Sequence, residues 1–113
     1  MNPTDDPSEP LGVEPDALPQ VRWLDVRRAP AFGKSPVMLP DAVWRDPALV
    51  DSWSGELDPT HDVVVYCVYG HEVSRNTALR LCALGVRAWF LRGGIDAWAA
   101  AGRPVVGKPV LAD

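Results

Sequence analysis

The second half of this 113-residue chain alternates between strand and helix patterns, and this alternation limits the fold more than any other feature. Residues 63–67 form a continuous apolar run, and residues 74–84 place apolar side chains at helical spacing and end before Gly85. A second apolar run at 87–91 and a second short helical pattern at 95–101 follow. Strands that alternate with helices across short loops form a parallel sheet with covered faces. The sequence therefore predicts an α/β fold, with a parallel sheet flanked by helices on both faces.

The first half of the domain contains fewer regular patterns. Residues 21–26 predict another strand. Asp46 and Pro47 are residue types that favour a helix N-cap and the first helical position, so residues 46–53 predict a short helix. Three prolines interrupt residues 29–41, and we expect irregular structure there.

Residues 1–20 differ in composition from the rest of the chain. They hold five prolines and five acidic residues, and no lysine or arginine. This composition disfavours helices and strands, so we expect an extended arm that can drape over the domain. The predicted organisation is a proline-rich acidic N-terminal arm at 1–20 and a single domain at 21–113.

The sequence shows no targeting or membrane signal. The first ten residues have neither the basic stretch nor the apolar stretch of a secretory signal, and no run approaches the roughly 20 apolar residues that span a bilayer. We therefore expect a cytoplasmic protein with no membrane partner. Cys67 and Cys82 would then remain thiols, and their spacing is not that of metal ligands. We expect no metal and no other cofactor.

Charge is distributed unevenly along the chain, whose net charge is −4. Residues 1–66 hold 12 acidic and 5 basic side chains, a balance of −7, whereas residues 67–113 hold 3 acidic and 6 basic ones, a balance of +3. The electropositive part suits a small anionic substrate. Its surplus is too small to indicate a nucleic-acid partner.

Cys67 ends the apolar run at 63–67, where a turn containing Gly70 leads into the helix. Because α/β folds bind ligands at the carboxyl ends of their parallel strands, we expect Cys67 to lie at a binding site. Amides of the turn and of the first helical turn favour an anion and the thiolate form of the cysteine. Such a thiolate is a nucleophile at the floor of an anion pocket. Cys82 is instead expected on the apolar face of its helix, in the core.

Several short motifs resemble, in the same order, those of the single-domain rhodanese family. The resemblance covers residues 21–105 and implies a rhodanese-like parallel sheet flanked by helices. The motifs are Leu24-Asp25-Val26-Arg27, Leu39-Pro40-Asp41-Ala42, Tyr66-Cys67-x-x-Gly70, Ala78-x-x-Leu81-x-x-x-Gly85 and Leu91-x-Gly93-Gly94-x-x-x-Trp98.

The resemblance also implies a reaction. In that family a cysteine thiolate attacks the outer sulfur of thiosulfate, releases sulfite and carries the sulfur as a persulfide, which cyanide or a thiol then removes. Cys67 would be this catalytic nucleophile, in a thiosulfate sulfurtransferase with a small anionic sulfur donor and a small-molecule or protein thiol as acceptor. Backbone amides after Cys67 would bind the anion, and Gly70 would permit the turn. The residues expected to bind substrate are Val68, Tyr69, Gly70, His71, Glu72, Val73, Ser74 and Arg75.

Five further polar residues lie near the expected site, two in the first half of the domain and three after Cys67. Asp25 and Arg27 are expected to organise the fold beside the site, because a buried aspartate at a strand end accepts backbone or arginine hydrogen bonds. His71 either belongs to a solvated loop or supplies a proton or positive charge. Glu72 either belongs to the solvated loop and points away from a bound anion, or it contacts the acceptor. Arg75 either contacts substrate or forms a salt bridge.

The turn departs from the usual family pattern in its length. Ser74 lies seven residues after Cys67, one more than is usual in the family, and related cysteine phosphatases and arsenate reductases use longer loops for larger oxyanions. Those phosphatases have an arginine six residues after the cysteine, where this chain has Val73, so phosphatase activity is disfavoured. Two alternatives stay open: a thiol-dependent enzyme acting on an oxyanion such as arsenate or chromate, and a non-catalytic rhodanese-like binding or sensing module. The retained cysteine argues against the second.

Overall fold

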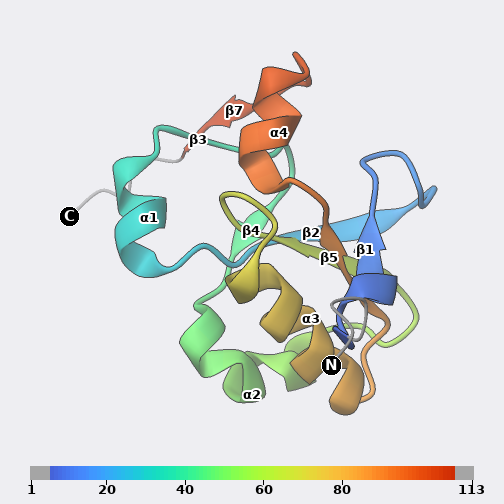
Figure 1. The fold of residues 1–113 in the computed structure, drawn as a ribbon. Coiled ribbons are helices and arrows are strands. Elements are labelled where there is room, and N and C mark those ends of the chain that lie inside the picture. Colours follow the sequence, from blue (N-terminus) through green and yellow to red (C-terminus); the bar gives the residue numbers. More distant parts are fainter. Residues whose placement is uncertain (1–5, 109–113) are drawn as a thin grey trace.

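The computed structural model describes residues 6–108, which are built around a five-stranded sheet (Figure 1). Its strands lie in the order β1-β6-β5-β2-β4, and neighbouring strands are parallel. The predicted α/β fold with a parallel sheet is confirmed. The strands are β1 (Gly12–Val13), β2 (Val21–Asp25), β4 (Val43–Trp44), β5 (Asp62–Tyr66) and β6 (Ala88–Leu91).

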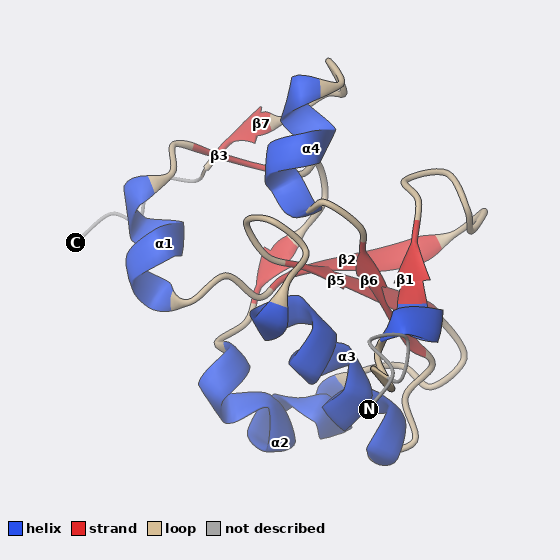
Figure 2. Ribbon diagram, viewed as in Figure 1, coloured by secondary structure: helices blue, strands red, loops and turns tan. Residues whose placement is uncertain are grey.

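Helices cover both faces of this sheet. In Figure 1, α2 and α3 lie on one side of the sheet and α4 lies on the other. A separate pair of antiparallel strands, β3 and β7, lies outside the main sheet (Figure 2). The helices are α1 (Ala29–Lys34), α2 (Val50–Trp53), α3 (Glu72–Ala83) and α4 (Gly94–Ala100), and the outer strands are β3 (Val37–Met38) and β7 (Val106–Gly107).

The core has two layers because successive side chains of a strand point to opposite faces of the sheet. On β5, Val63 and Val65 pack in the layer that contains Ala78 and Leu81 of α3. Val64 and Tyr66 of the same strand pack in the layer that contains Ile95 and Trp98 of α4. Burial of one such valine stabilises the fold by about 1.5 kcal/mol or more. The continuous apolar run in the sequence thus reflects a strand that is buried on both faces.

Two segments expected to lack regular structure contain it. Within the predicted arm, residues Glu9–Leu11 form a 3-10 helix and β1 adds an edge strand to the sheet, with Gly12 opposite Phe90. The prediction of an arm without helix or strand was therefore wrong at residues 9–13. Residues 29–41 were also expected to be irregular, but they contain α1 and β3. Pro30 stands in the first turn of α1, where the missing N–H costs nothing.

The expected helix at 46–53 is present in two parts. Residues Pro47–Leu49 form a 3-10 helix, and α2 continues from Val50. The side chain of Asp46 accepts a hydrogen bond from the amide of Ala48 at 2.9 Å, as predicted for the N-cap. Among residues 6–108, no helix has the length and apolar character that a membrane span requires.

Helix α3 departs from its prediction at two positions. It begins at Glu72 and not at Ser74, so residues expected in the loop lie in its first turn. Cys82 was expected in the core, yet it is exposed, and this prediction was wrong. The buried stripe of α3 consists of Ser74, Thr77, Ala78 and Leu81, and Cys82 lies just outside it.

Candidate active site

Cys67 directly follows β5, at the carboxyl end of the central strand. Its side chain is only 6% exposed, and its Sγ donates a hydrogen bond to Ser74 Oγ at 3.1 Å. Ser74 is itself buried in the first turns of α3. Cys67 is one of the residues that line a pocket of about 170 Å³. This cysteine therefore lies where the core meets a small cavity.

The loop after Cys67 is fixed by the start of α4. The amide of Ile95 donates to the carbonyl of Cys67 at 3.0 Å, and the amide of Asp96 donates to the carbonyl of Val68 at 2.9 Å. In Figure 1 this loop lies between α3 and α4. Backbone groups at the helix start that would otherwise lack partners thus hold the loop in place.

Three glycines allow the loop and α4 to approach so closely. A Cβ added to Gly94 would overlap the carbonyls of Cys67 and Val68, and one added to Gly70 would lie 2.6 Å from the Gly93 nitrogen. All three glycines also have positive φ, which side chains with a Cβ adopt only with strain. The sequence indicated a turn at Gly93-Gly94, but it did not reveal that this turn supports the loop after Cys67.

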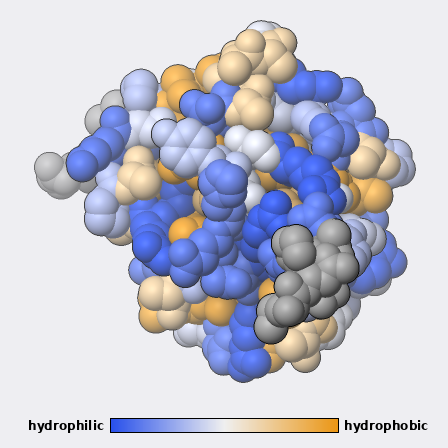
Figure 3. All heavy atoms as spheres, viewed as in Figure 1, coloured by the Kyte–Doolittle hydropathy of each residue, from blue (hydrophilic) through white to orange (hydrophobic). Residues whose placement is uncertain are grey.

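Only some of the loop residues that were predicted to bind substrate line the pocket beside Cys67. Val68, Tyr69, His71 and Val73 line the pocket together with Cys67. Gly70 is buried against the Gly93-Gly94 turn, and the Ser74 hydroxyl reaches the sulfur. Glu72 is exposed and does not line the pocket. Hydrophilic side chains cover most of the face that Figure 3 shows.

Arg75 forms the salt bridge that was one of its two interpretations. Its Nη1 donates to Glu9 Oε2 at 2.8 Å, and its Nε donates to the carbonyl of Gly70 at 3.0 Å. Arg92 donates to the other oxygen of Glu9 at 2.6 Å. Hydrogen bonds from Arg75 and then from Arg92 lower the pKa of Glu9 from its ordinary value. The guanidinium of Arg75 is therefore directed to the N-terminal segment and does not line the Cys67 pocket.

Asp25 and Arg27 form a buried ion pair beside the site. Arg27 Nη2 donates to Asp25 Oδ2 at 2.6 Å and to the carbonyl of Val37 at 2.9 Å. Tyr66 donates its hydroxyl hydrogen to Asp25 Oδ2 at 2.9 Å and accepts from the amide of Leu39 at 3.1 Å. Burial, and then the negative charge of Asp25, raise the pKa of Tyr66. Arg27 borders the pocket, but its charge is matched by Asp25.

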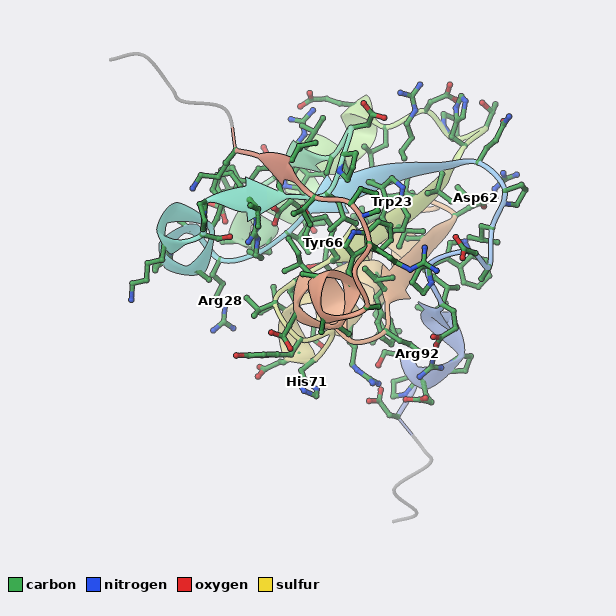
Figure 4. The ribbon with its side chains drawn as sticks, turned by 90° about the horizontal axis from the view of Figure 1, so that it is seen from above. Trp23, Arg28, Asp62, Tyr66, His71 and Arg92 are labelled. Atoms are coloured by element: carbon green, nitrogen blue, oxygen red, sulfur yellow. The ribbon has the colours of Figure 1, made fainter. Side chains whose placement is uncertain are left out.

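The opposite wall of the pocket comes from residues that the sequence did not single out. Arg28 and Ala31, at the start of α1, face the Cys67 loop across the cavity. In Figure 4, Arg28 and His71 project toward the same edge of the molecule, whereas Tyr66 lies inside it. The pairing of β2 with β5 explains this proximity, because the segment after β2 then lies beside the segment after β5. Pairing of strands so far apart in sequence cannot be read from local patterns.

The described residues include no group of three or more histidine, cysteine or acidic side chains that could hold a metal ion. The pocket lining includes Cys67, and the buried hydroxyl of Ser74 is hydrogen-bonded to its thiol. This arrangement can support nucleophilic attack by sulfur on a small substrate.

Comparison with known proteins agrees with this geometry. Solved structures with a similar fold include a full-length protein from Lactobacillus plantarum, which is 28% identical with a TM-score of 0.75 and matches over 88% of this chain and 89% of that one. A rhodanese-like domain protein from Staphylococcus aureus is 19% identical with a TM-score of 0.70, over 87% of this chain and 98% of that one. A thiosulfate sulfurtransferase from Pseudomonas aeruginosa is 24% identical with a TM-score of 0.69, over 85% of this chain but 19% of that one.

The latter two likenesses show the fold alone. A comparison with curated proteins found no match. The model of the rhodanese-like domain family, however, matches residues 14–101, which is most of the chain. This match begins just after β1, inside the predicted arm, and ends just beyond α4. The chain therefore belongs to the rhodanese-like domain family.

Proposed function

We propose that the protein is a sulfurtransferase that carries sulfur as a persulfide on Cys67. The observation that carries this proposal is the position of Cys67, which lines a pocket of about 170 Å³ and whose Sγ is hydrogen-bonded to Ser74 at 3.1 Å. The thiolate attacks the outer sulfur of thiosulfate or a similar donor, an S–S bond forms, and sulfite leaves with the electron pair. A thiol or cyanide then removes the outer sulfur and restores the thiolate.

The surroundings of Cys67 support transfer of sulfur more than hydrolysis of a phosphate ester. Val73 occupies a position on the pocket wall and offers no hydrogen bond to an anion. Arg75, the nearest arginine in sequence, is held by Glu9 and by the carbonyl of Gly70. A phosphoryl group would need a bidentate guanidinium that these two residues do not supply.

The test is the intact mass of the protein after incubation with thiosulfate. We expect a gain of one sulfur atom, about 32 Da, which disappears when cyanide or a thiol is added. Because Cys82 is exposed and is also a thiol, two variants are compared. Cys82→Ser should still gain the sulfur, and Cys67→Ser should not.

Four results would contradict the proposal. In the first, the mass of the wild type stays unchanged at every thiosulfate concentration. In the second, Cys67→Ser gains one sulfur atom as the wild type does. In a third case, the wild type could reduce arsenate or chromate with a thiol while gaining no sulfur from thiosulfate, which would favour the oxyanion enzyme instead. A protein that binds thiosulfate without any covalent change would favour the binding or sensing module.

A further inference from the structure

The segment 6–11 precedes the residues that match the family, yet it packs closely on the domain. The family match begins at residue 14. Ser8 is buried, and Leu11 packs against the core layer that contains α3. Figure 1 shows the 3-10 helix Glu9–Leu11, in dark blue, next to α3. Because Glu9 lies outside the matched residues, a part for it in the reaction is not one that the family match implies.

Arg75 joins Glu9 to the loop after Cys67 through two different nitrogens. Its Nη1 donates to Glu9 Oε2 at 2.8 Å, and its Nε donates to the carbonyl of Gly70 at 3.0 Å. The guanidinium also lies over the ring of Phe90, 4.6 Å from the ring centre. A guanidinium is planar, so a partner that holds one of its N–H groups also orients the others. The carboxylate of Glu9 therefore orients the N–H group that binds the loop.

The peptide group between Gly70 and His71 is the part of the loop that this contact controls. A trans peptide is planar, and its carbonyl and its N–H point in opposite directions. A hydrogen bond that holds the carbonyl of Gly70 therefore also fixes the direction of the His71 N–H. Gly70 has a φ of 72°, and glycine has more freedom to rotate the peptide that follows it than other residues have. Because His71 lines the Cys67 pocket, rotation of this peptide would change the pocket wall.

We propose that Glu9 is a positioning residue for the reaction at Cys67, and that it acts through Arg75 on the peptide between Gly70 and His71. With the contact in place, the loop keeps one arrangement, and no rotation of the peptide has to precede attack by the thiolate. Without it, other orientations become populated and only a fraction of the molecules is ready to react. The effect on the reaction rests on the proposed sulfurtransferase function, whereas the effect on the loop does not.

The test measures the reaction and the loop separately, in a Cys82→Ser background and at a temperature at which circular dichroism shows every variant to be folded. Glu9→Gln keeps the shape of the side chain but removes the charge that strengthens its hydrogen bond to Arg75. We expect the second-order rate constant of sulfur loading from thiosulfate to fall about fivefold. Hydrogen exchange of the backbone amides at 68–71 should become at least about threefold faster, with little change in the sheet.

Two variants test whether Glu9 acts through its charge and through Arg75. Glu9→Asp keeps a carboxylate and should load sulfur faster than Glu9→Gln does. Arg75→Lys removes the Nε–H that binds the carbonyl of Gly70. Addition of Glu9→Gln to Arg75→Lys should therefore slow loading no further, because two residues that act in series are not additive.

Asp16→Asn is the matched control. Asp16 also precedes β2 and accepts two hydrogen bonds from one arginine, since Arg103 approaches its oxygens at 2.6 and 3.2 Å. That guanidinium lies over the ring of Trp98 in α4, and its described contacts do not include the loop at 68–71. We expect Asp16→Asn to change neither the rate of sulfur loading nor the exchange of the loop amides.

The outcomes separate this inference from the proposed function. The assignment of Glu9 is wrong if Glu9→Gln matches the wild type in both measurements, or if exchange rises equally throughout the domain. It is also wrong if Glu9→Gln slows Arg75→Lys by the factor by which it slows the wild type, or if Glu9→Asp loads no faster than Glu9→Gln. If the wild type gains no sulfur from thiosulfate, the sulfurtransferase function is wrong, and the exchange measurement decides alone: faster exchange confined to 68–71 supports the positioning of the loop by Glu9, and unchanged exchange excludes it.

Discussion

Ser74 is the hydrogen-bond partner of the Cys67 sulfur among the described residues, and the two side chains are 3.1 Å apart. Once the cysteine has lost its proton, the Ser74 hydroxyl can reverse the bond and donate to the thiolate or to the inner sulfur of a persulfide. A hydrogen bond to a charged group contributes about 1.5–3 kcal/mol. We therefore expect Ser74→Ala to slow persulfide formation roughly tenfold, as measured by the rate of mass gain with thiosulfate.

Thr77→Ala is the matched control for Ser74→Ala. Thr77 is also a buried hydroxyl residue of α3, but its Oγ1 donates to the carbonyl of Val73 at 2.8 Å and does not reach the sulfur. We expect it to lower the melting temperature without slowing persulfide formation more than about twofold. Equal rates for Ser74→Ala and wild type would show that the hydroxyl has no part in the reaction.

Sequence reasoning placed Cys67 correctly at the end of a central strand but missed part of its surroundings. Cys67 was predictable because a strand end followed by a glycine turn is a local pattern. Ser74 was expected to begin the helix and bind substrate, yet it lies inside the helix and contacts the sulfur. Arg28 gave no local signal, since its relation to Cys67 depends on the pairing of β2 with β5.

At the level of elements, the N-terminal segment supports the loop after Cys67 through a chain of two contacts. The 3-10 helix Glu9–Leu11 places Glu9 between Arg75 and Arg92, and Arg75 in turn donates to the carbonyl of Gly70. Strand β1 continues the contact, because the amide of Arg92 donates to the carbonyl of Val13 at 3.0 Å. This segment thus stabilises the start of α3 and the end of β6.

Glu9→Gln should therefore lower the melting temperature in a pH-dependent way. The arginine hydrogen bonds lower the pKa of Glu9 below its ordinary value of 4.5, so the folded state favours the ionised carboxylate. The stabilising contribution is present above pH 4.5 and is lost as the pH falls through the lower value of the folded state. Melting temperatures of wild type and Glu9→Gln should differ at neutral pH and converge in acid.

Glu14→Gln serves as the control for this effect. Glu14 also lies near Arg92, but the closest approach of their charged atoms is 3.9 Å and its side chain is 74% exposed. We expect no measurable change in its melting temperature at any pH, because exposed pairs of this kind contribute little. A difference between Glu9→Gln and wild type that persists unchanged in acid would exclude the charged contact as its cause.

The elements that the sequence predicted well are those with internal periodicity. β5, α3, β6 and α4 each carry an apolar pattern that is long enough to identify. β1 has two residues and owes its extended form to pairing with β6, and three prolines obscured the short helix α1. Such elements depend on tertiary contacts, which outweigh weak local preferences.

At the level of the whole molecule, a buried polar network joins the main sheet to the segment that leads from α1 to β4. Asp25 of β2 accepts from Arg27 and from Tyr66 of β5, Arg27 reaches the carbonyl of Val37, and Tyr66 accepts from the amide of Leu39. Removal of one partner from a buried ion pair typically costs about 3–5 kcal/mol. The sequence predicted the arginine contact of Asp25, but Tyr66 appeared in it only as part of an apolar strand.

Alkaline titration tests whether the hydrogen bond from Tyr66 to Asp25 persists in the folded protein. Burial and the charge of Asp25 raise the pKa of Tyr66 above its ordinary value of 10.0, so the folded state favours the neutral phenol that donates to Asp25. The stability gained from this preference is complete below pH 10.0 and is lost as the pH rises toward the folded value.

The chain has two tyrosines, and Tyr69→Phe leaves Tyr66 as the only one. In this variant, ultraviolet absorbance of tyrosinate should appear only as circular dichroism reports unfolding in alkali, whereas in urea it should appear near pH 10.0. Tyrosinate formed near that pH in the folded variant would mean that Tyr66 is accessible to solvent, and that the contact between β5 and Asp25 opens without unfolding of the sheet.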